Sequence, residues 1–124
     1  MGKPGSVIGW MLDVRERAEL LAKHPPRYAT VVAHHVTLAT DAEDHDLPPA
    51  VRASVVGRTD DEQGVEAMVV MIDGDTDRPD GSTFHITWSL GNGRRARESN
   101  DVLKERGWQE LDHPIAINPT PARI

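Results

Sequence analysis

The sequence predicts an α+β fold with mainly antiparallel strands. One observation is the order of its segments, which alternate between β-branched apolar runs and two helix-like stretches: helix, three strands, a further strand, helix, strand. The other is its size, because 124 residues with 38% apolar content suffice for one hydrophobic core but not for two. We therefore expect a single domain over residues 1–124, with an ordered core at about residues 8–118 between Gly- and Pro-rich ends.

The first helix is predicted over residues 14–23. Asp13 is an acidic residue that can accept backbone N–H bonds, and Glu16 follows it three positions later, which is the spacing of a capping box. The pair Pro25-Pro26 then ends the helix.

Strands are predicted next. Thr30–Thr40 is β-branched and apolar enough to form one strand, and an acidic loop over residues 41–46 follows it. Arg52–Arg58 and Val65–Ile72 are two more strands, and residues 59–64 between them suit an antiparallel hairpin.

A turn-rich segment over residues 73–82 leads into a further strand, Thr83–Leu90. After Gly91-Asn92-Gly93, a basic run leads to a short helix at about residues 95–106, with Gly107 as the residue that closes it. Residues 113–118 supply the last predicted strand.

Bulk properties narrow the class of partner. The formal net charge of −6 argues against a large surface that grips nucleic acid through many phosphates, and 4% aromatic content leaves few stacking platforms, while a small nucleotide or an RNA end stays possible. The sequence has no cysteine, so disulfides, thiolate metal sites and a cysteine nucleophile are excluded. No stretch approaches the roughly 20 apolar residues of a membrane span, and no leader pattern is present. We expect a soluble cytoplasmic protein that does not bind membranes; its oligomeric state stays open.

The most informative feature is an internal similarity between two strands. Residues 32–40 align without a gap on residues 82–90, so that His35 matches His85 and Thr37 matches Thr87. Side chains alternate faces along a strand, so residues two apart point the same way. On the second strand one face is then wholly polar (Thr83, His85, Thr87, Ser89) and the other wholly apolar (Phe84, Ile86, Trp88, Leu90).

A polar face of this kind must point at water or a cleft, since burying unpaired imidazole and hydroxyl groups costs about 1 to 3 kcal/mol each. On the first strand His35 and Thr37 share a face, while His34 falls on the opposite face and is the structural neighbour.

Two His-x-Thr strands suit phosphodiester chemistry. One neutral imidazole can take a proton from an attacking water while a protonated imidazole donates one to the leaving oxygen. The hydroxyls of Thr37 and Thr87 can hydrogen-bond the phosphate oxygens as charge builds on them. This chemistry needs no metal and no cofactor, and we expect neither. We assign His85 as the general base and His35 as the general acid, although the near-symmetry of the motifs also permits the reverse order.

With these motifs the chain resembles the two-histidine phosphoesterase superfamily, whose signature is a pair of His-x-Thr/Ser motifs on symmetry-related strands. The resemblance covers about residues 28–90. It implies a bilobal α+β domain with a pseudo-two-fold axis, helices flanking the strands, and a cleft between the lobes. It also implies hydrolysis of 2′,3′-cyclic phosphates of nucleotides or RNA ends, as in RNA repair and RNA processing.

A narrower resemblance is to the cyclic phosphodiesterase modules of fungal-type tRNA ligases. It rests on Ala33-His-His-Val-Thr-Leu38 and on Glu98-Ser-Asn100 after a Gly-rich turn, which makes Ser99 and Asn100 candidate substrate-binding residues. The sequence departs from that pattern in its compact spacing of about fifty residues between the motifs and in having no ligase or kinase module.

Other candidate binding residues flank the motifs. Arg94, Arg95 and Arg97 lie near the start of the second predicted helix, where free N–H groups also favour anions, so they are candidates to hold a distal phosphate, or else form a solvated basic face. Tyr28 and Trp108 are candidates to stack on a base, or else belong to the core.

Two alternatives of other classes stay open. One is a metal-dependent oxygenase or cupin-like site built from several histidines and the acidic loop, although His34 and His35, as neighbours on a strand, are not expected to share one ion. The residues concerned are His34, His35, His45, His85, His113, Asp41, Glu43, Asp44 and Asp46. The other is a non-catalytic module that binds a nucleotide without turning it over.

Overall fold

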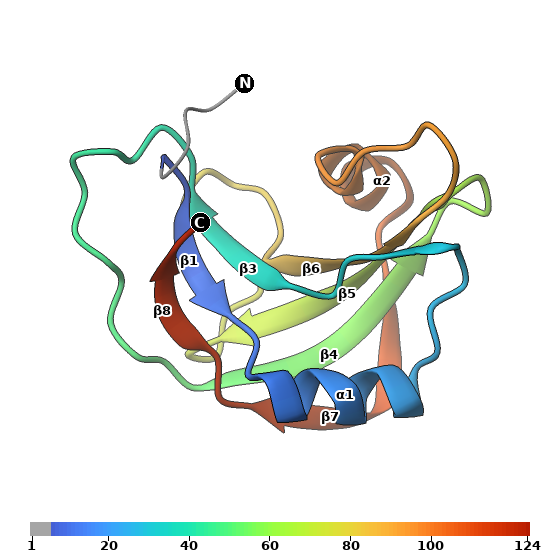
Figure 1. The fold of residues 1–124 in the computed structure, drawn as a ribbon, viewed down its shortest axis with the longest axis horizontal. Coiled ribbons are helices and arrows are strands. Elements are labelled where there is room, and N and C mark those ends of the chain that lie inside the picture. Colours follow the sequence, from blue (N-terminus) through green and yellow to red (C-terminus); the bar gives the residue numbers. More distant parts are fainter. Residues whose placement is uncertain (1–5) are drawn as a thin grey trace.

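The computed structural model describes residues 6–124 and has the predicted α+β class (Figure 1). Within this part of the chain, antiparallel strands form two sheets, and two helices pack on them. The elements are β1 (Ile8–Met11), α1 (Val14–Lys23), β2 (Thr30–Val31), β3 (His35–Ala39), β4 (Ala53–Asp60), β5 (Val65–Ile72), β6 (His85–Leu90), α2 (Glu98–Arg106), β7 (Gln109–Ile117) and β8 (Thr120–Arg123).

The two sheets divide the strands unequally. The smaller has the order β3-β1-β8 and the larger the order β2-β6-β5-β4-β7. The smaller sheet lies beside one end of the larger in Figure 1, and β3 contacts β6 where they meet. The two strands that carry the His-x-Thr motifs therefore belong to different sheets but lie next to each other.

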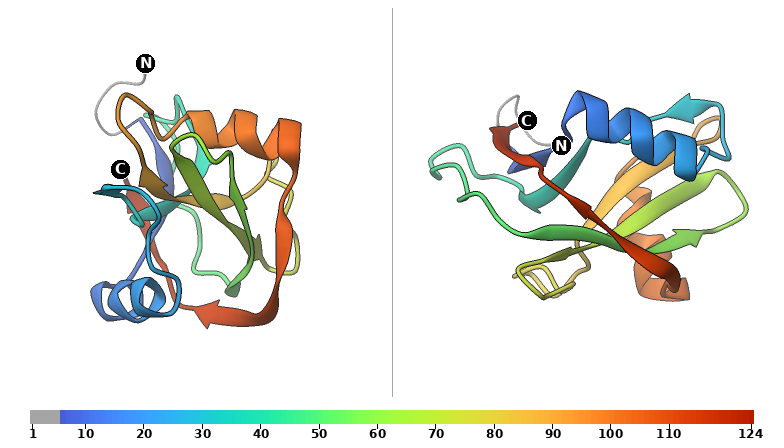
Figure 2. Two further views of the ribbon diagram at one scale, coloured as in Figure 1. Left: turned by 90° about the vertical axis from the view of Figure 1, so that its right-hand side faces the viewer. Right: turned by 90° about the horizontal axis from the view of Figure 1, so that it is seen from below.

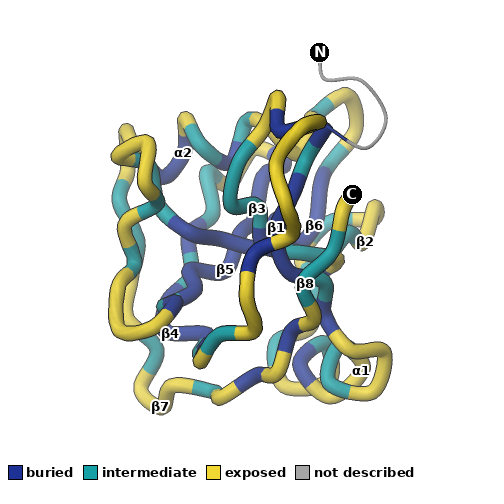
Figure 3. The backbone as a smooth tube through the Cα atoms, turned by 90° about the vertical axis from the view of Figure 1, so that its left-hand side faces the viewer, coloured by how far each residue is buried: buried dark blue, intermediate teal, exposed yellow. Residues whose placement is uncertain are grey.

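The hydrophobic core lies on both faces of the larger sheet. Its main cluster joins Trp10 of β1, Leu20 of α1 and Val36 of β3 to residues of the larger sheet such as Met68 and Trp88. A smaller cluster packs Leu103 of α2 on the opposite face. Figure 2 shows α1 and α2 on different sides of the larger sheet, and Figure 3 shows β5 and β6 as largely buried.

The first helix is confirmed at residues 14–23. The Asp13 carboxylate caps it by accepting from the backbone N–H groups of Arg15 at 3.0 Å and Glu16 at 3.1 Å. The reciprocal half of the predicted capping box is wrong, because the Glu16 carboxylate instead accepts from Asn118, whose backbone N–H lies 2.8 Å away. That bond joins α1 to the end of β7. Neither helix described for residues 6–124 is long and apolar enough to cross a membrane.

The predicted hairpin is confirmed as β4 and β5, which pair antiparallel from Ala53–Ile72 to Asp60–Glu66, with a register shift between Val55 and Gly57. The second helix begins at Glu98, three residues later than predicted, and ends at Arg106. It is capped by Gly107, whose φ of +68° lies in the left-handed region that favours glycine. The last predicted strand is part of the longer β7.

The prediction of one strand over Thr30–Thr40 is wrong. β2 ends at Val31 and pairs with β6, whereas β3 begins at His35 and pairs with β1 in the other sheet. Between them Ala33 has a φ of +43°, a left-handed conformation that no continuous strand permits. The chain thus changes sheets just before the first motif.

The C-terminal segment also differs from expectation. The loose end expected after residue 118 is instead β8, which pairs with β1. Pro121 is compatible with this strand because β8 lies at the edge of its sheet, where the N–H that proline lacks is not needed. The expected looseness of the N-terminus falls partly on residues 1–5, which lie outside the described residues.

Candidate active site

The two motifs meet at one cavity of about 220 Å³. His35 and Thr37 reach it from β3, and His85 and Thr87 reach it from β6. The remaining lining residues come from the segments before β3, after β3, before β6 and around the start of α2: Val32, Thr40, Arg78, Ala96, Arg97 and Asn100. This lining has two arginines and no carboxylate among the described residues, so it suits an anion.

The hydrogen bond of His85 determines which of its nitrogens carries the proton. Its Nδ1 lies 2.8 Å from the backbone carbonyl oxygen of Thr83, which can only accept a hydrogen bond. Nδ1 therefore carries the proton, and in the neutral imidazole Nε2 keeps its lone pair. Burial lowers the pKa of His85, and the charge of Arg78 lowers it further against the opposing effect of the Thr83 bond. A neutral His85 is thus a ready proton acceptor at neutral pH.

The pKa of His35 is lowered as well, although His35 is less buried than His85. Burial lowers its pKa from an ordinary value of 6.5 to about 4, and the charges that His34 and His85 would carry add to the effect. His35 is therefore also neutral in the free protein at neutral pH.

The sequence predicted that His34 lies on the opposite face from His35, but the structure places the two rings together. The Nδ1 atoms of the two rings are 2.9 Å apart, and the rings are nearly perpendicular, at 87°. The prediction failed because strand alternation does not extend back through Ala33, whose left-handed backbone precedes the pair.

Thr87 is held by the first turn of α2 and by the segment before it. Its hydroxyl lies 2.9 Å from the Ser99 hydroxyl and 3.3 Å from the carbonyl oxygen of Ala96. Ser99, a predicted binding residue, is fully buried and supports Thr87 without lining the cavity itself. Asn100, the other residue of that pair, does line the cavity.

Arg78 was not predicted as a site residue. Its guanidinium donates to the Ser82 hydroxyl at 2.7 Å, the Asn100 side-chain oxygen at 3.0 Å and the Thr37 carbonyl at 3.3 Å. It thereby joins β3, the turn before β6, and α2 around the cavity, with only 9% of its side chain exposed. The sequence offered one weak signal, an arginine in the turn that leads into the second motif.

Three predicted binding residues lie away from this cavity. Arg94 is ion-paired with Asp61 at 2.8 Å and with Glu98 at 3.0 Å. Arg95 is exposed and does not line the cavity, whereas its neighbour Arg97 does. Tyr28 donates its hydroxyl to Asp60 at 2.7 Å and is likewise outside the lining.

The polar face predicted for β6 breaks at Ser89. A register shift between Glu66 and Ala67 of β5 interrupts the alternation opposite this point. Ser89 consequently donates to the buried Glu66 carboxylate at 2.7 Å and does not line the cavity. Leu90, predicted to share a face with Trp88, packs with Val102 of α2 instead of in the main core.

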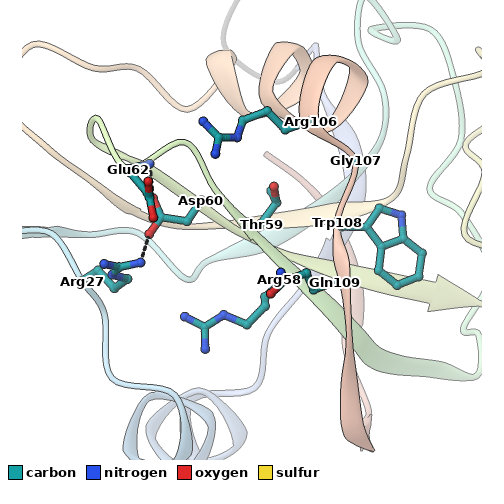
Figure 4. Close-up of a pocket in the computed structure, with 9 residues that line it drawn as sticks. All are labelled: Arg27, Arg58, Thr59, Asp60, Glu62, Arg106, Gly107, Trp108 and Gln109. Carbon is teal, nitrogen blue, oxygen red and sulfur yellow. Dashed lines mark hydrogen bonds and ion pairs between the residues drawn. The ribbon is translucent and has the colours of Figure 1, made fainter.

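A larger cavity of about 320 Å³ lies near the C-terminal end of α2 (Figure 4). Three arginines surround it, but Arg27 is paired with Asp60, and Arg58 lies 3.5 Å from the buried Glu66. Glu62 adds another negative charge to its lining. The charges of this network cancel. At the motif cavity, by contrast, no carboxylate is among the described lining residues, and Asp80, which lies 3.4 Å from the Arg78 guanidinium, is outside the lining.

Trp108 lines that second cavity and also packs against the cluster under α2. A Cβ added at Gly57 would lie 2.1 Å from the Trp108 ring, so the indole lies directly on the β4 backbone. This contact fits the core interpretation of Trp108 better than the base-stacking one.

The residues proposed for the metal alternative are not gathered at one point. Over residues 6–124, no group of three or more His, Cys, Asp or Glu side chains is arranged to hold a metal ion. His45 and His113 are both exposed, in the acidic loop and on β7 respectively.

Comparison of the chain with protein-family models, with curated proteins and with solved structures finds no significant match.

Proposed function

We propose that the chain is a metal-independent phosphodiesterase of the two-histidine type, which hydrolyses 2′,3′-cyclic phosphates of nucleotides or RNA ends. The observation that carries the proposal is the convergence of two His-x-Thr motifs, one from each sheet, on a cavity lined by arginines and no carboxylate among the described residues. The two-lobed, pseudo-symmetric arrangement of that family is part of the proposal, and so is a cytoplasmic site of action in RNA processing or repair.

The tautomer of His85 supports its role as the general base. Its Nε2 takes a proton from a water molecule, and the water oxygen bonds to phosphorus. The bond from phosphorus to one ribose oxygen breaks, and that oxygen receives a proton from His35. The product is a ribose phosphomonoester. Thr37, Thr87 and the two arginines hydrogen-bond the phosphoryl oxygens as their charge increases.

The lining also supports recognition of the phosphate and ribose over the base. The cavity of about 220 Å³ is smaller than the roughly 300–1,000 Å³ of typical drug-sized pockets, and none of its lining residues is a Phe, Tyr or Trp. Such a site fits one end of a nucleotide chain, with the base outside it.

The test is hydrolysis of 2′,3′-cyclic nucleotides and of RNA with a cyclic phosphate end, all in excess EDTA. The wild-type protein is compared with His35→Ala, His85→Ala and the control His113→Ala, which changes an exposed histidine of β7. We expect turnover by the wild type and the control, and a loss on the order of 10²-fold or more in each motif variant.

Turnover that disappears in EDTA, or that survives in both motif variants, would contradict the proposal. Saturable nucleotide binding without turnover would instead identify a binding module.

A further inference from the structure

The proposed mechanism uses His35 and His85 and assigns no role to His34. Its side chain is exposed, yet its Nδ1 lies 2.9 Å from the Nδ1 of the less exposed His35. At this distance one nitrogen must carry a proton and the other a lone pair, because two N–H groups or two lone pairs would repel each other. The pair is therefore a hydrogen bond that leads from solvent to the wall of the cavity.

The backbone before the pair is held firmly in its unusual conformation. Ala33 has a φ of +43°, which is rare for a residue with a side chain. Its N–H donates to the Thr87 carbonyl at 2.9 Å, and its carbonyl accepts from the Arg17 side chain of α1, also at 2.9 Å. These bonds maintain the bend that brings His34 alongside His35, and they attach it to the second motif.

We propose that His34 is a positioning residue that keeps His35 protonated on Nε2 and supplies it with protons from solvent. In this arrangement His34 Nδ1–H donates to His35 Nδ1, so neutral His35 presents Nε2–H to the cavity. The inference rests on the proposed function for its catalytic consequence but not for the geometry of the pair.

The proposal resolves a difficulty in the acid step. With a pKa of about 4, His35 in the free protein is not an imidazolium at neutral pH. A proton relay from His34 removes the need for an imidazolium at His35. His35 Nε2 gives its proton to the leaving oxygen, while the Nδ1 proton of a protonated His34 moves to His35 Nδ1. His34 is left neutral, His35 is left as the Nδ1–H tautomer, and the charge transferred comes from the exposed ring.

The charges around the pair favour this division of roles. Arg78 and Arg97 line the same cavity as His35, and His85 faces it from β6. Arg17 of α1 lies behind, on the carbonyls of Val32 and Ala33. These basic groups disfavour a further positive charge within the cavity, whereas the exposed His34 ring can hold one in contact with water.

The first test reads the histidine tautomers directly, in protein with ¹⁵N-labelled imidazoles, by NMR across pH 4–8. His35 signals are assigned from their absence in His35→Gln. We expect the Nε2–H tautomer of His35 in the wild type and in His34→Asn, because the Asn amide nitrogen takes the place of Nδ1 as a donor. We expect a mixture of tautomers in His34→Ala. Identical His35 tautomers and titration in the wild type and His34→Ala would overturn the proposal.

The second test is kinetic and uses His34→Asn, which keeps the hydrogen bond but cannot pass on a proton. We expect its kcat for a 2′,3′-cyclic nucleotide at pH 7 to fall on the order of 10²-fold, with KM unchanged. We also expect the shape of the pH–rate profile to differ from that of the wild type. His113→Asn is the matched control and should behave as the wild type. An unchanged kcat and pH profile in His34→Asn would overturn the relay.

The two tests separate the two proposals. If no cyclic phosphate is turned over by the wild type while the His35 tautomer still depends on His34, the proposed function fails and the positioning role of His34 is supported.

Discussion

The low pKa of His35 makes a quantitative prediction about stability. Between pH 6.5, the ordinary value for histidine, and about pH 4, the value in the fold, the unfolded chain binds a proton at this position and the folded protein does not. Stability therefore rises with pH across this range. The contribution of His35 to the free energy of unfolding is fully present above pH 6.5 and is lost as pH falls toward 4.

The magnitude follows from the same two values. The difference between 6.5 and about 4 corresponds to on the order of 3 kcal/mol, of which about 2 kcal/mol is lost by pH 5. The substitution His35→Gln removes the titrating group, so the free energy of unfolding of the wild type minus that of the variant should fall by about 2 kcal/mol between pH 7 and pH 5. Subtraction removes most of the pH dependence that the two proteins share, including that of His24, whose pKa is also lowered by burial.

The assay is urea denaturation followed by the fluorescence of the three tryptophans, at pH 7 and at pH 5. His113→Gln, at an exposed position of β7, should track the wild type at both pH values. A difference between wild type and His35→Gln that stays constant to within about 0.5 kcal/mol would refute the reasoning, because His35 would then titrate alike in both states. The need for a proton from His34 would disappear with it.

Three other substitutions test the framework around the cavity. Gly9→Ala should lower the free energy of unfolding by about 1 to 3 kcal/mol in urea denaturation, because the new Cβ would lie 2.0 Å from the Val36 carbonyl oxygen and push β3 away from β1. Arg78→Lys keeps the charge but loses the branched set of donors, so we expect a higher KM in steady-state assays and a loss of about 1 to 3 kcal/mol in stability. Thr87→Val should cost about 1 to 3 kcal/mol by leaving the buried Ser99 hydroxyl without its partner, and should lower kcat/KM, whereas Thr87→Ser should retain most of both.

Much of the framework could be predicted because its signals are local. The Asp13 cap and the spacing of apolar residues in β4 and β5 depend only on residues close together in the sequence, and they predicted the correct element types. The matching patterns predicted that each motif places a histidine and a threonine two residues apart on one face, and the family resemblance implied that the two motifs meet in a cleft. The cavity indeed brings these four side chains together.

The incorrect predictions share a different physical cause, which is contact between segments that are distant in the sequence. Thr30–Thr40 has the composition of one strand, but Ala33 takes a left-handed conformation whose bonds to Arg17 and Thr87 no local pattern reveals. The role of Arg78 depends in the same way on partners in three separate segments. These same contacts assemble the candidate site, which explains why the details of the site were harder to predict than the elements that carry it.

The distribution of charge shows how an acidic protein can present a site for an anion. The chain carries 20 acidic against 14 basic residues, yet several of the acids are neutralised by ion pairs outside the cavity. Asp60 is paired with Arg27, and Asp61 and Glu98 are both paired with Arg94, at the β4–β5 turn and the start of α2. Arg78 and Arg97 line the cavity with no acid among the described lining residues. Net charge therefore argues only against an extended polyanion, because a single phosphate responds to the few groups within a Debye length of about 8 to 10 Å.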